Sequence, residues 1–329
     1  MALRGFASFA ISKAIGAIIT IFAIICANFL LFRLIPGDPI RMMFRDPRVS
    51  AEAMQSAREK FGLDKPLWGQ FICYLEELSH GNLGISFWQR RPVLEVIADR
   101  IPQTLLLIIA ALIMAVIVGT ILGAIAGWKS GTKLDSSILT VSLALWAVPG
   151  FCIAIIFLLI FAFKLAIFPL GGISTPASGL SGFAHWRDVL WHLFLPGSSL
   201  VIWYMGEYVI LMRSSMVDVL GQDYITTARA KGLKESAILR NHAIRNALLP
   251  VITMTGINLG YVVAGVVQTE TVFAWPGVGR LMYDAVMKRD FPLLQGTFLV
   301  LAVAVVLANL VVDLIYGYID PRIKVGKSE

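Results

Sequence analysis

Six long apolar runs separated by polar segments form the main pattern of this chain. Each run is close to the roughly 20 residues that an α-helix needs to cross about 30 Å of hydrocarbon. Helices are expected because backbone polar groups that face lipid must be satisfied within their own segment. The runs are Ala14 to Phe32, Leu105 to Ile125, Ile138 to Phe163, Leu190 to Met212, Val251 to Val267 and Leu293 to Tyr318. The pattern therefore predicts an all-α integral membrane protein with six transmembrane helices.

Composition and charge agree with this fold class. Hydrophobic residues make up 57% of the 329 residues and charged residues only 15%, whereas soluble domains contain roughly 45 to 50% apolar residues. The net charge of +7 follows from an excess of basic residues in cytoplasmic loops, so it requires no nucleic acid as a partner.

Loop length and basic residues set the predicted orientation. The first loop, from Pro36 to about Arg100, exceeds the roughly 60 residues within which basic side chains hold a loop in the cytoplasm. The termini, the Lys129 to Lys133 turn and the loop between runs four and five carry thirteen basic residues, against five in the other two loops. Both termini are therefore predicted to be cytoplasmic.

Three parts are expected along the chain. Residues 1–98 hold the first transmembrane helix, an uncleaved anchor, and a long external segment with a helix predicted at Ser50 to Phe61. Residues 99–319 hold five transmembrane helices, and residues 320–329 form a cytoplasmic tail. Small residues at every fourth position predict close helix packing in runs two and five. They are Gly119, Gly123 and Gly127, and Gly256, Gly260 and Ala264.

Helix-breaking residues interrupt two of the apolar runs. Pro149-Gly150 in run three and Pro196-Gly197 in run four can break or kink a helix. Transport pathways often need such breaks, but ordinary kinks filled by neighbouring helices produce the same signature. Both interpretations stay open from the sequence.

Charged and polar residues within the runs are candidates for a pathway or gate, because acids are costly in a membrane. Glu207 is either such a residue or an acid with access to water near the cytoplasmic surface. Gln268 and Glu270 either line the substrate entrance or are solvated at a helix end. Asp313 is expected to pair with a basic residue of the loop between runs four and five or of the tail.

The polar loop between runs four and five is the most informative segment. A helix is predicted from Val217 to Lys231, with Gly232 ending it, and a second from about Lys234 to Leu248. Pro250 is expected to open the fifth transmembrane helix, where its missing N–H costs little. Physical arguments alone support two interpretations of this loop equally: an amphipathic link on the lipid surface, or a docking site for another protein.

The order of helix, Ala-x-x-x-Gly, helix and Leu-Pro in this loop resembles the cytoplasmic coupling loop of ABC importer permeases. Ala228, Gly232, Leu249 and Pro250 carry the resemblance. Thr226 and Thr227 replace the Glu and first Ala of the general pattern. The stretch from Gly232 to Pro250 is also longer than usual, and both departures resemble the branch that imports dipeptides, oligopeptides and nickel.

Further stretches resemble permeases of that branch in the same order along nearly the whole chain, and together they are highly specific. They are Arg33–Pro39, Gly62–Leu67, Gly81–Ser86, Arg213–Met216, Glu270–Arg280 and Asp320–Ile323.

The resemblance implies a type I ABC importer permease fold in the bacterial inner membrane, forming half of a translocation pathway with a second homologous permease. It implies that one or two cytoplasmic ATPases bind a coupling loop of residues 213–249. The ATPases would hold ATP and Mg²⁺, and this chain would hold no cofactor. It also implies a solute-binding protein on external loops that include Trp275 to Arg280. Small peptides are the first expected substrates, before nickel chelates, opines, glutathione and short glycans.

Within the loop, Ala228 and Gly232 are expected to provide close packing and shape, and Arg229, Lys231 and Arg240 polar contacts with the ATPase. The full set of expected coupling residues is Thr226, Thr227, Ala228, Arg229, Lys231, Gly232, Arg240, Leu249 and Pro250.

Chemistry within the chain itself is not indicated. The Gly326-Lys-Ser328 tripeptide is not a P-loop, because Pro321 occupies the position of its first glycine. The four histidines lack metal-ligand spacing, and no nucleophile and base are recognisably arranged for catalysis. The chain is therefore predicted not to be an enzyme.

Two alternatives to an ABC permease stay open from the sequence. An ion-coupled secondary transporter is expected to carry more buried acids or an inverted repeat, and a membrane scaffold leaves the loop unexplained.

Overall fold

The protein, described here by a computed structural model, is defined for residues 2–34 and 65–319. Every regular element in these residues is helical, apart from one isolated bridge between Ile85 and Pro92. The helix predicted at Ser50 to Phe61 and the predicted tail lie outside the described residues. The chain forms two compact units, residues 1–102 with 277–329, and residues 103–276. The sequence-based division at residue 98 stays a prediction.

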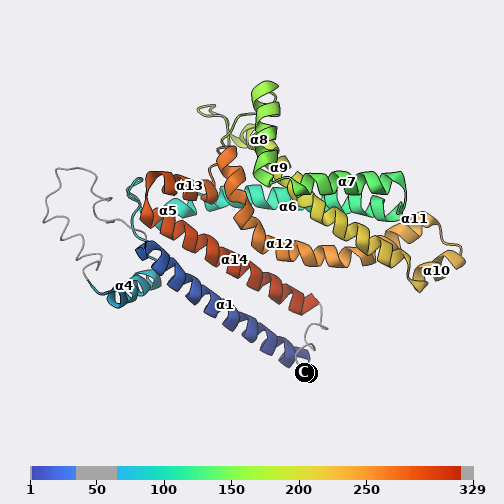
Figure 1. The fold of residues 1–329 in the computed structure, drawn as a ribbon, viewed down its shortest axis with the longest axis horizontal. Coiled ribbons are helices and arrows are strands. Elements are labelled where there is room, and N and C mark those ends of the chain that lie inside the picture. Colours follow the sequence, from blue (N-terminus) through green and yellow to red (C-terminus); the bar gives the residue numbers. More distant parts are fainter. Residues whose placement is uncertain (1, 35–64, 320–329) are drawn as a thin grey trace. The chain divides into compact units, whose positions relative to one another are not determined.

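The first unit is built around two long helices, α1 (Ala2–Leu34) and α14 (Phe291–Ile319), which pack against each other along their lengths (Figure 1). The Nζ of Lys13 lies 2.9 Å from the Oδ2 of Asp313, and the amide of Asn28 donates to the carbonyl of Gln295. The helices are therefore antiparallel. The partner that the structure gives Asp313 is thus a lysine of α1 and not a basic residue of the loop between runs four and five; the tail, the other expected source, lies outside the described residues.

Shorter helices complete this unit: α4 (Leu67–Ser79), α5 (Val93–Ala98) and α13 (Val278–Lys288). The buried carboxylate of Asp290, between α13 and α14, accepts hydrogen bonds from the Oγ of Ser86 at 2.6 Å and from the N–H groups of Phe87 and Trp88. It also accepts from the N–H of Leu293 in the first turn of α14. One carboxylate thus ties the loop before α5 to the start of α14.

The second unit contains α6 (Ile101–Trp128), α7 (Lys133–Ala147), α8 (Gly150–Phe157), α9 (Gly182–Leu220), α10 (Asp223–Ala230), α11 (Glu235–Ile238) and α12 (Ile244–Val272). Two π-helices, η1 (Leu158–Lys164) and η2 (Leu239–Ala243), extend α8 and join α11 to α12. The core lies mainly between α6, α9 and α12. It includes Leu107, Ala111, Tyr208, Met212, Met216 and Trp275.

Glycines of α6 bring its backbone directly onto α9. A Cβ atom built on Gly123 would lie 2.6 Å from the carbonyl oxygen of Val209, and one on Gly127 would lie 2.4 Å from the Cβ of Met216. Gly119 meets Tyr208 and the carbonyl of Met205 in the same way. Close packing through the glycines of run two is confirmed. The side chains at positions 259–265, which include two of the three small residues of run five, lie outside the described residues.

The two Pro-Gly dipeptides behave differently. At Pro149 the third apolar run breaks, and α7 meets the helix formed by α8 and η1 at 95°. In contrast, α9 continues through Pro196 as a single helix of 39 residues, so this proline ends no helix. Of the two interpretations left open for the third run, Ile138 to Phe163, the structure shows a break at Pro149, because a proline cannot continue the hydrogen-bonding pattern of α7.

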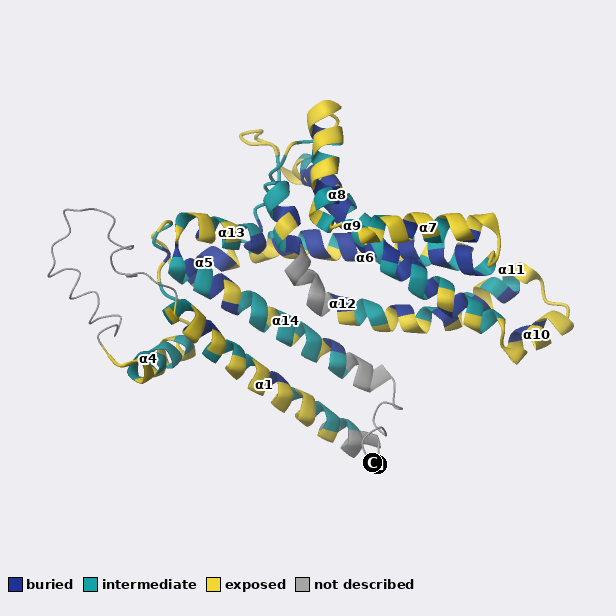
Figure 2. Ribbon diagram, viewed as in Figure 1, coloured by how far each residue is buried: buried dark blue, intermediate teal, exposed yellow. Residues whose placement is uncertain are grey.

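Four of the described helices are long and apolar enough to cross a membrane, and the bent pair of α7 with α8 and η1 makes up to five. They lie within Ser8–Leu34, Val93–Trp128, Gly182–Leu220 and Phe291–Leu314. Exposed positions run along the length of α1 (Figure 2), and they include Ile11, Ile15 and Phe22. An apolar outer surface of this kind is typical of a helix that faces lipid. The structure is that of a multi-pass membrane protein.

Candidate functional site

The loop between α9 and α12 is the candidate site, and it contains two short helices, α10 and α11, one on each side of Gly232. Helix α9 ends at Leu220, and the turn at Gly221 and Gln222 separates it from α10. The predicted helix from Val217 to Lys231 is therefore interrupted at Gly221 and Gln222, and its first four residues belong to α9. The predicted end is confirmed, because α10 stops at Ala230 and Gly232 adopts the left-handed conformation with φ +76°.

The second half of the loop runs without interruption into the membrane helix. The chain is helical from α11 through η2 into α12, so no helix boundary exists at Leu248. Pro250 lies inside α12, six residues after its first residue Ile244, and does not open it. The helix continues through Pro250 because the preceding turns have already started it and only one backbone hydrogen bond is lost at the proline.

A small apolar cluster holds the two short helices together. Ile225 and Ala228 of α10 pack with Ile238 of α11, and all three are buried. The carbonyl of Arg229 accepts the N–H of Gly232 at 2.9 Å, which closes the end of α10. Ala228 therefore packs within this chain, and its role in coupling stays a prediction. A Cβ atom on Gly232 would meet nothing within 4 Å, so glycine is favoured there by the left-handed backbone and not by crowding inside this chain.

The outer surface of the loop is polar and basic, with some exposed apolar side chains. Arg229 pairs with Glu235 across the bend at 3.0 Å, and the Nε of Arg240 donates to the side chain of Asn241. Leu249 is 62% exposed, and Leu233 is also exposed. The remaining predicted coupling residues, Thr226, Thr227, Lys231 and Pro250, are exposed as well. Except for Ala228, the predicted coupling set therefore lies on an accessible surface of this chain.

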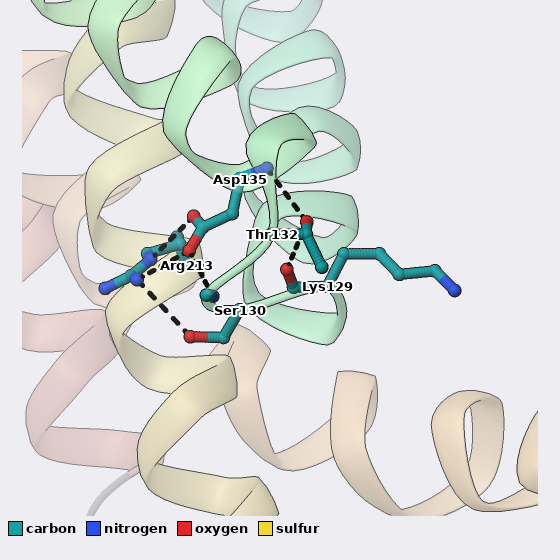
Figure 3. A network of polar contacts seen from close by, with 6 residues as sticks. Lys129, Ser130, Thr132, Asp135 and Arg213 are labelled. Carbon is teal, nitrogen blue, oxygen red and sulfur yellow. Dashed lines mark hydrogen bonds and ion pairs between the residues drawn. The ribbon is translucent and has the colours of Figure 1, made fainter.

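A largely buried ion pair, drawn in Figure 3, lies near the end of α9 that leads into the loop. The guanidinium of Arg213 on α9 donates from Nε to Oδ1 of Asp135 at 3.1 Å and from Nη2 to Oδ2 at 2.8 Å. The Oδ2 of Asp135 also accepts the N–H of Gly131, and the Oγ of Ser130 accepts from Nη2 of Arg213. This bidentate pair joins the first turn of α7 to α9 two turns before α9 ends.

Asp135 was not among the residues that sequence reasoning selected. A signal was present, because Thr132 and Asp135 have the spacing of a helix-capping motif just before an apolar run. In the structure, Oγ1 of Thr132 accepts the N–H of Asp135 as the N-cap of α7. The sequence could thus have located the start of α7, but it carries no indication that Arg213, 78 residues later, is the partner.

The acid of run four lies in a polar cluster between α9 and α12. Asn258 on α12, which is 6% exposed, donates to Oε2 of Glu207 at 2.8 Å and to the hydroxyl of Tyr208 at 3.1 Å. Glu207 itself is partly buried. The role of Glu207 as a pathway or gate residue stays a prediction.

The residues near the end of α12 differ in exposure. Glu270 is fully buried and its Oε1 accepts from the hydroxyl of Thr104 at 2.7 Å, so the interpretation of Glu270 as a residue solvated at a helix end is wrong. Gln268 is exposed. Trp275 is also fully buried, with its indole N–H donating to the carbonyl of Gln103. Trp275 therefore cannot form part of a docking surface for a binding protein, which corrects the sequence-based expectation.

Within the described ranges, no three His, Cys, Asp or Glu side chains are grouped so that they could hold a metal ion. The candidate site presents a polar, basic surface with exposed leucines.

Comparison with known proteins assigns the family. The family model described as "Binding-protein-dependent transport system inner membrane component" matches residues 119–325, and the model for the N-terminal part of such membrane components matches residues 6–108. Fold and family together define an inner-membrane permease. The chain belongs to the family of inner-membrane components of binding-protein-dependent transport systems.

Curated relatives match over nearly their whole length. The Di/tripeptide transport system permease protein DppB of Pseudomonas aeruginosa (strain UCBPP-PA14) is 38% identical over 95% of this chain and 98% of its own. The Dipeptide transport system permease protein DppB of Escherichia coli (strain K12) is 36% identical with the same coverage. The Glutathione transport system permease protein GsiC of Escherichia coli O6:H1 (strain CFT073) is 35% identical over 96% of this chain and 99% of its own. The relatives are permeases, as predicted, and not enzymes.

Proposed function

We propose that this chain is the peptide-transporting permease subunit of an ATP-driven ABC importer. It forms half of the translocation pathway, with a second homologous permease as the other half, and receives small peptides from an external solute-binding protein. Two relatives named for dipeptide or di/tripeptide transport support this substrate class. A third relative is named for the transport of glutathione, which is a modified tripeptide and therefore belongs to the same substrate class.

The observation that carries the proposal is the geometry of the loop from Asp223 to Pro250. Two short helices held by a buried apolar cluster present a basic surface with exposed leucines, and α11 continues without a break into α12. A force on this loop would therefore reach α12 directly. We assign the loop as the docking site for a cytoplasmic ATPase, which would hold ATP and Mg²⁺.

The experiment measures the energy source of uptake. The permease, purified with its partner subunits and reconstituted in liposomes with the binding protein, is supplied with a labelled dipeptide. We expect uptake to require Mg²⁺ and ATP on the side of the ATPase and to persist when ionophores collapse all ion gradients. Uptake that proceeds without ATP and stops on adding an ionophore would instead identify an ion-coupled secondary transporter.

The proposed topology has six transmembrane helices, with the α7 to η1 pair as one bent span and α12 as another, and with both termini in the cytoplasm. Cys73 on α4, which is partly buried, then lies outside, and Lys231 in the loop lies inside. In a Cys26→Ala, Cys152→Ala background, a membrane-impermeant maleimide should label Cys73 in intact cells. In Lys231→Cys combined with Cys73→Ala, labelling should appear only after permeabilisation. The reverse pattern would invert the topology.

A further inference from the structure

The ion pair between Asp135 and Arg213 joins two segments that both lead to the cytoplasmic side of the proposed topology. Arg213 is seven residues before Leu220, where α9 ends and the turn into α10 begins. Asp135 is in the first turn of α7, directly after the turn that follows α6. The pair therefore connects the α6–α7 hairpin to the last two turns of α9, next to the candidate coupling loop.

Both helices of the hairpin approach α9, and α6 does so at several levels, through Gly119, Gly123 and Gly127. At the end of α6, a Cβ atom on Gly127 would lie 3.0 Å from the carbonyl oxygen of Arg213, so the two backbones are in direct contact. Helix α7 approaches the backbone of α9 two turns after Asp135, where a Cβ on Gly206 would lie 3.1 Å from the carbonyl oxygen of Ser142. At the start of α7 the ion pair links Asp135 to Arg213 of α9. The side chain of Asp135 is 5% exposed and that of Arg213 is 29% exposed, so the pair is largely shielded from water.

Because the ion pair is bidentate, it holds the side chains of Asp135 and Arg213 in one relative orientation. Two parallel N–H···O bonds between planar groups fix the orientation of the two side chains, whereas one bond leaves them free to rotate. The third contact, from the N–H of Gly131 to Oδ2 of Asp135, fixes the carboxylate to the turn before α7. A displacement of the end of α9 is thus passed to the turn and to the start of α7 together.

We propose that Asp135 and Arg213 are positioning residues for coupling, which make the start of α7 follow the end of α9 when the loop from Asp223 to Pro250 is displaced. The α6–α7 hairpin and the end of α9 then move as one body. This inference rests on the proposed function of that loop. It assigns a role to the Arg213–Met216 stretch, which the docking site itself does not explain.

The test compares peptide uptake per ATP hydrolysed in the reconstituted full complex, at matched amounts of folded permease. Arg213→Lys keeps the positive charge beside Asp135 but removes the bidentate fork. We expect this variant to insert normally and to lower the ratio about threefold or more, within the range by which residues between two sites alter their coupling. Asp135→Glu, which keeps the charge but lengthens the side chain, should lower the ratio in the same direction.

A second arm asks whether the two residues act as one unit. In the double variant the ratio should be no lower than in the more affected single variant, because the interaction is already lost in each. The matched control is Asp313→Asn, which breaks the ion pair of similar length between Lys13 and Asp313. Because that pair connects α1 and α14 and not the elements around the loop, the control should keep the wild-type ratio.

The outcomes separate this inference from the proposed function. If Gly232→Asp lowers the ratio while Arg213→Lys and Asp135→Glu keep it, the inference is overturned and the docking loop stands. Effects that multiply in the double variant, or a loss of uptake strictly proportional to a loss of folded protein, also overturn it. If wild-type uptake does not depend on ATP, the proposed function itself fails.

Discussion

Gly232→Asp is expected to abolish most ATP-driven uptake while leaving the permease folded and inserted. The left-handed backbone at position 232 tolerates Asp better than most residues, and a new side chain meets nothing within 4 Å in this chain. The expected damage therefore comes from a carboxylate placed on the surface that we propose as the docking site for the ATPase. A buried unmatched charge at such an interface costs about 2 kcal/mol or more, which corresponds to about thirtyfold or more weaker docking and a similar loss of coupled uptake.

Two control variants make this prediction specific. Gly232→Asn has nearly the same size and backbone tolerance without the charge, so its defect should be much smaller. Gly179→Asp places the same side chain on another glycine with positive φ and open space, in the segment before α9, and should leave uptake unchanged. Uptake and ATP hydrolysis are measured together. If Gly232→Asp shows normal coupled uptake, the loop does not dock the ATPase.

Gly123→Leu is expected to cause the largest loss of stability among substitutions in the membrane helices. The Cβ alone would lie 2.6 Å from the carbonyl oxygen of Val209 and 2.8 Å from the Cβ of Met212, so α6 and α9 would have to separate. Overpacking of this kind costs about 1 to 3 kcal/mol, and contact with backbone on the other helix favours the upper end. The measurement is the fraction of folded permease that remains after heating in detergent.

Gly16→Leu provides the matched control. Gly16 lies in the first apolar run on α1 and is exposed, and a Cβ atom added there would meet nothing within 4 Å. The same change in side chain therefore adds apolar surface without forcing helices apart, and the thermal transition should match that of the wild type. Equal losses in both variants would show that leucine acts through helix propensity or insertion and not through the contact between α6 and α9.

Much of the candidate site was predictable because it depends on local sequence. Gly232 marks the end of α10 through its own backbone preference, and the apolar residues on the following helix indicate a packed face. The helix boundaries at Val217 and Pro250 were wrong for a different reason. Whether a chain continues as a helix past a glycine or a proline depends on the neighbouring turns and on the elements that pack against them.

The two Pro-Gly dipeptides make this dependence plain. Pro149 and Pro196 carry the same local signal, yet the helix breaks at the first and continues through the second. Pro196 is buried, and its neighbour Leu195 packs in an apolar cluster with Phe273 and Ala154. Packing of α9 on both sides can hold a helix across one missing hydrogen bond, which the sequence around the proline does not reveal.

The sequence alone determined that this is an apolar, multi-pass helical membrane protein and which family of permeases it belongs to, because run length, composition and ordered motifs are properties of the chain itself. Only the tertiary structure decided the partners: Asp135 with Arg213, Thr104 with Glu270, and Lys13 with Asp313. Each pair joins residues far apart along the chain. Their meeting depends on how helices pack side by side, and local preference carries no information about that register.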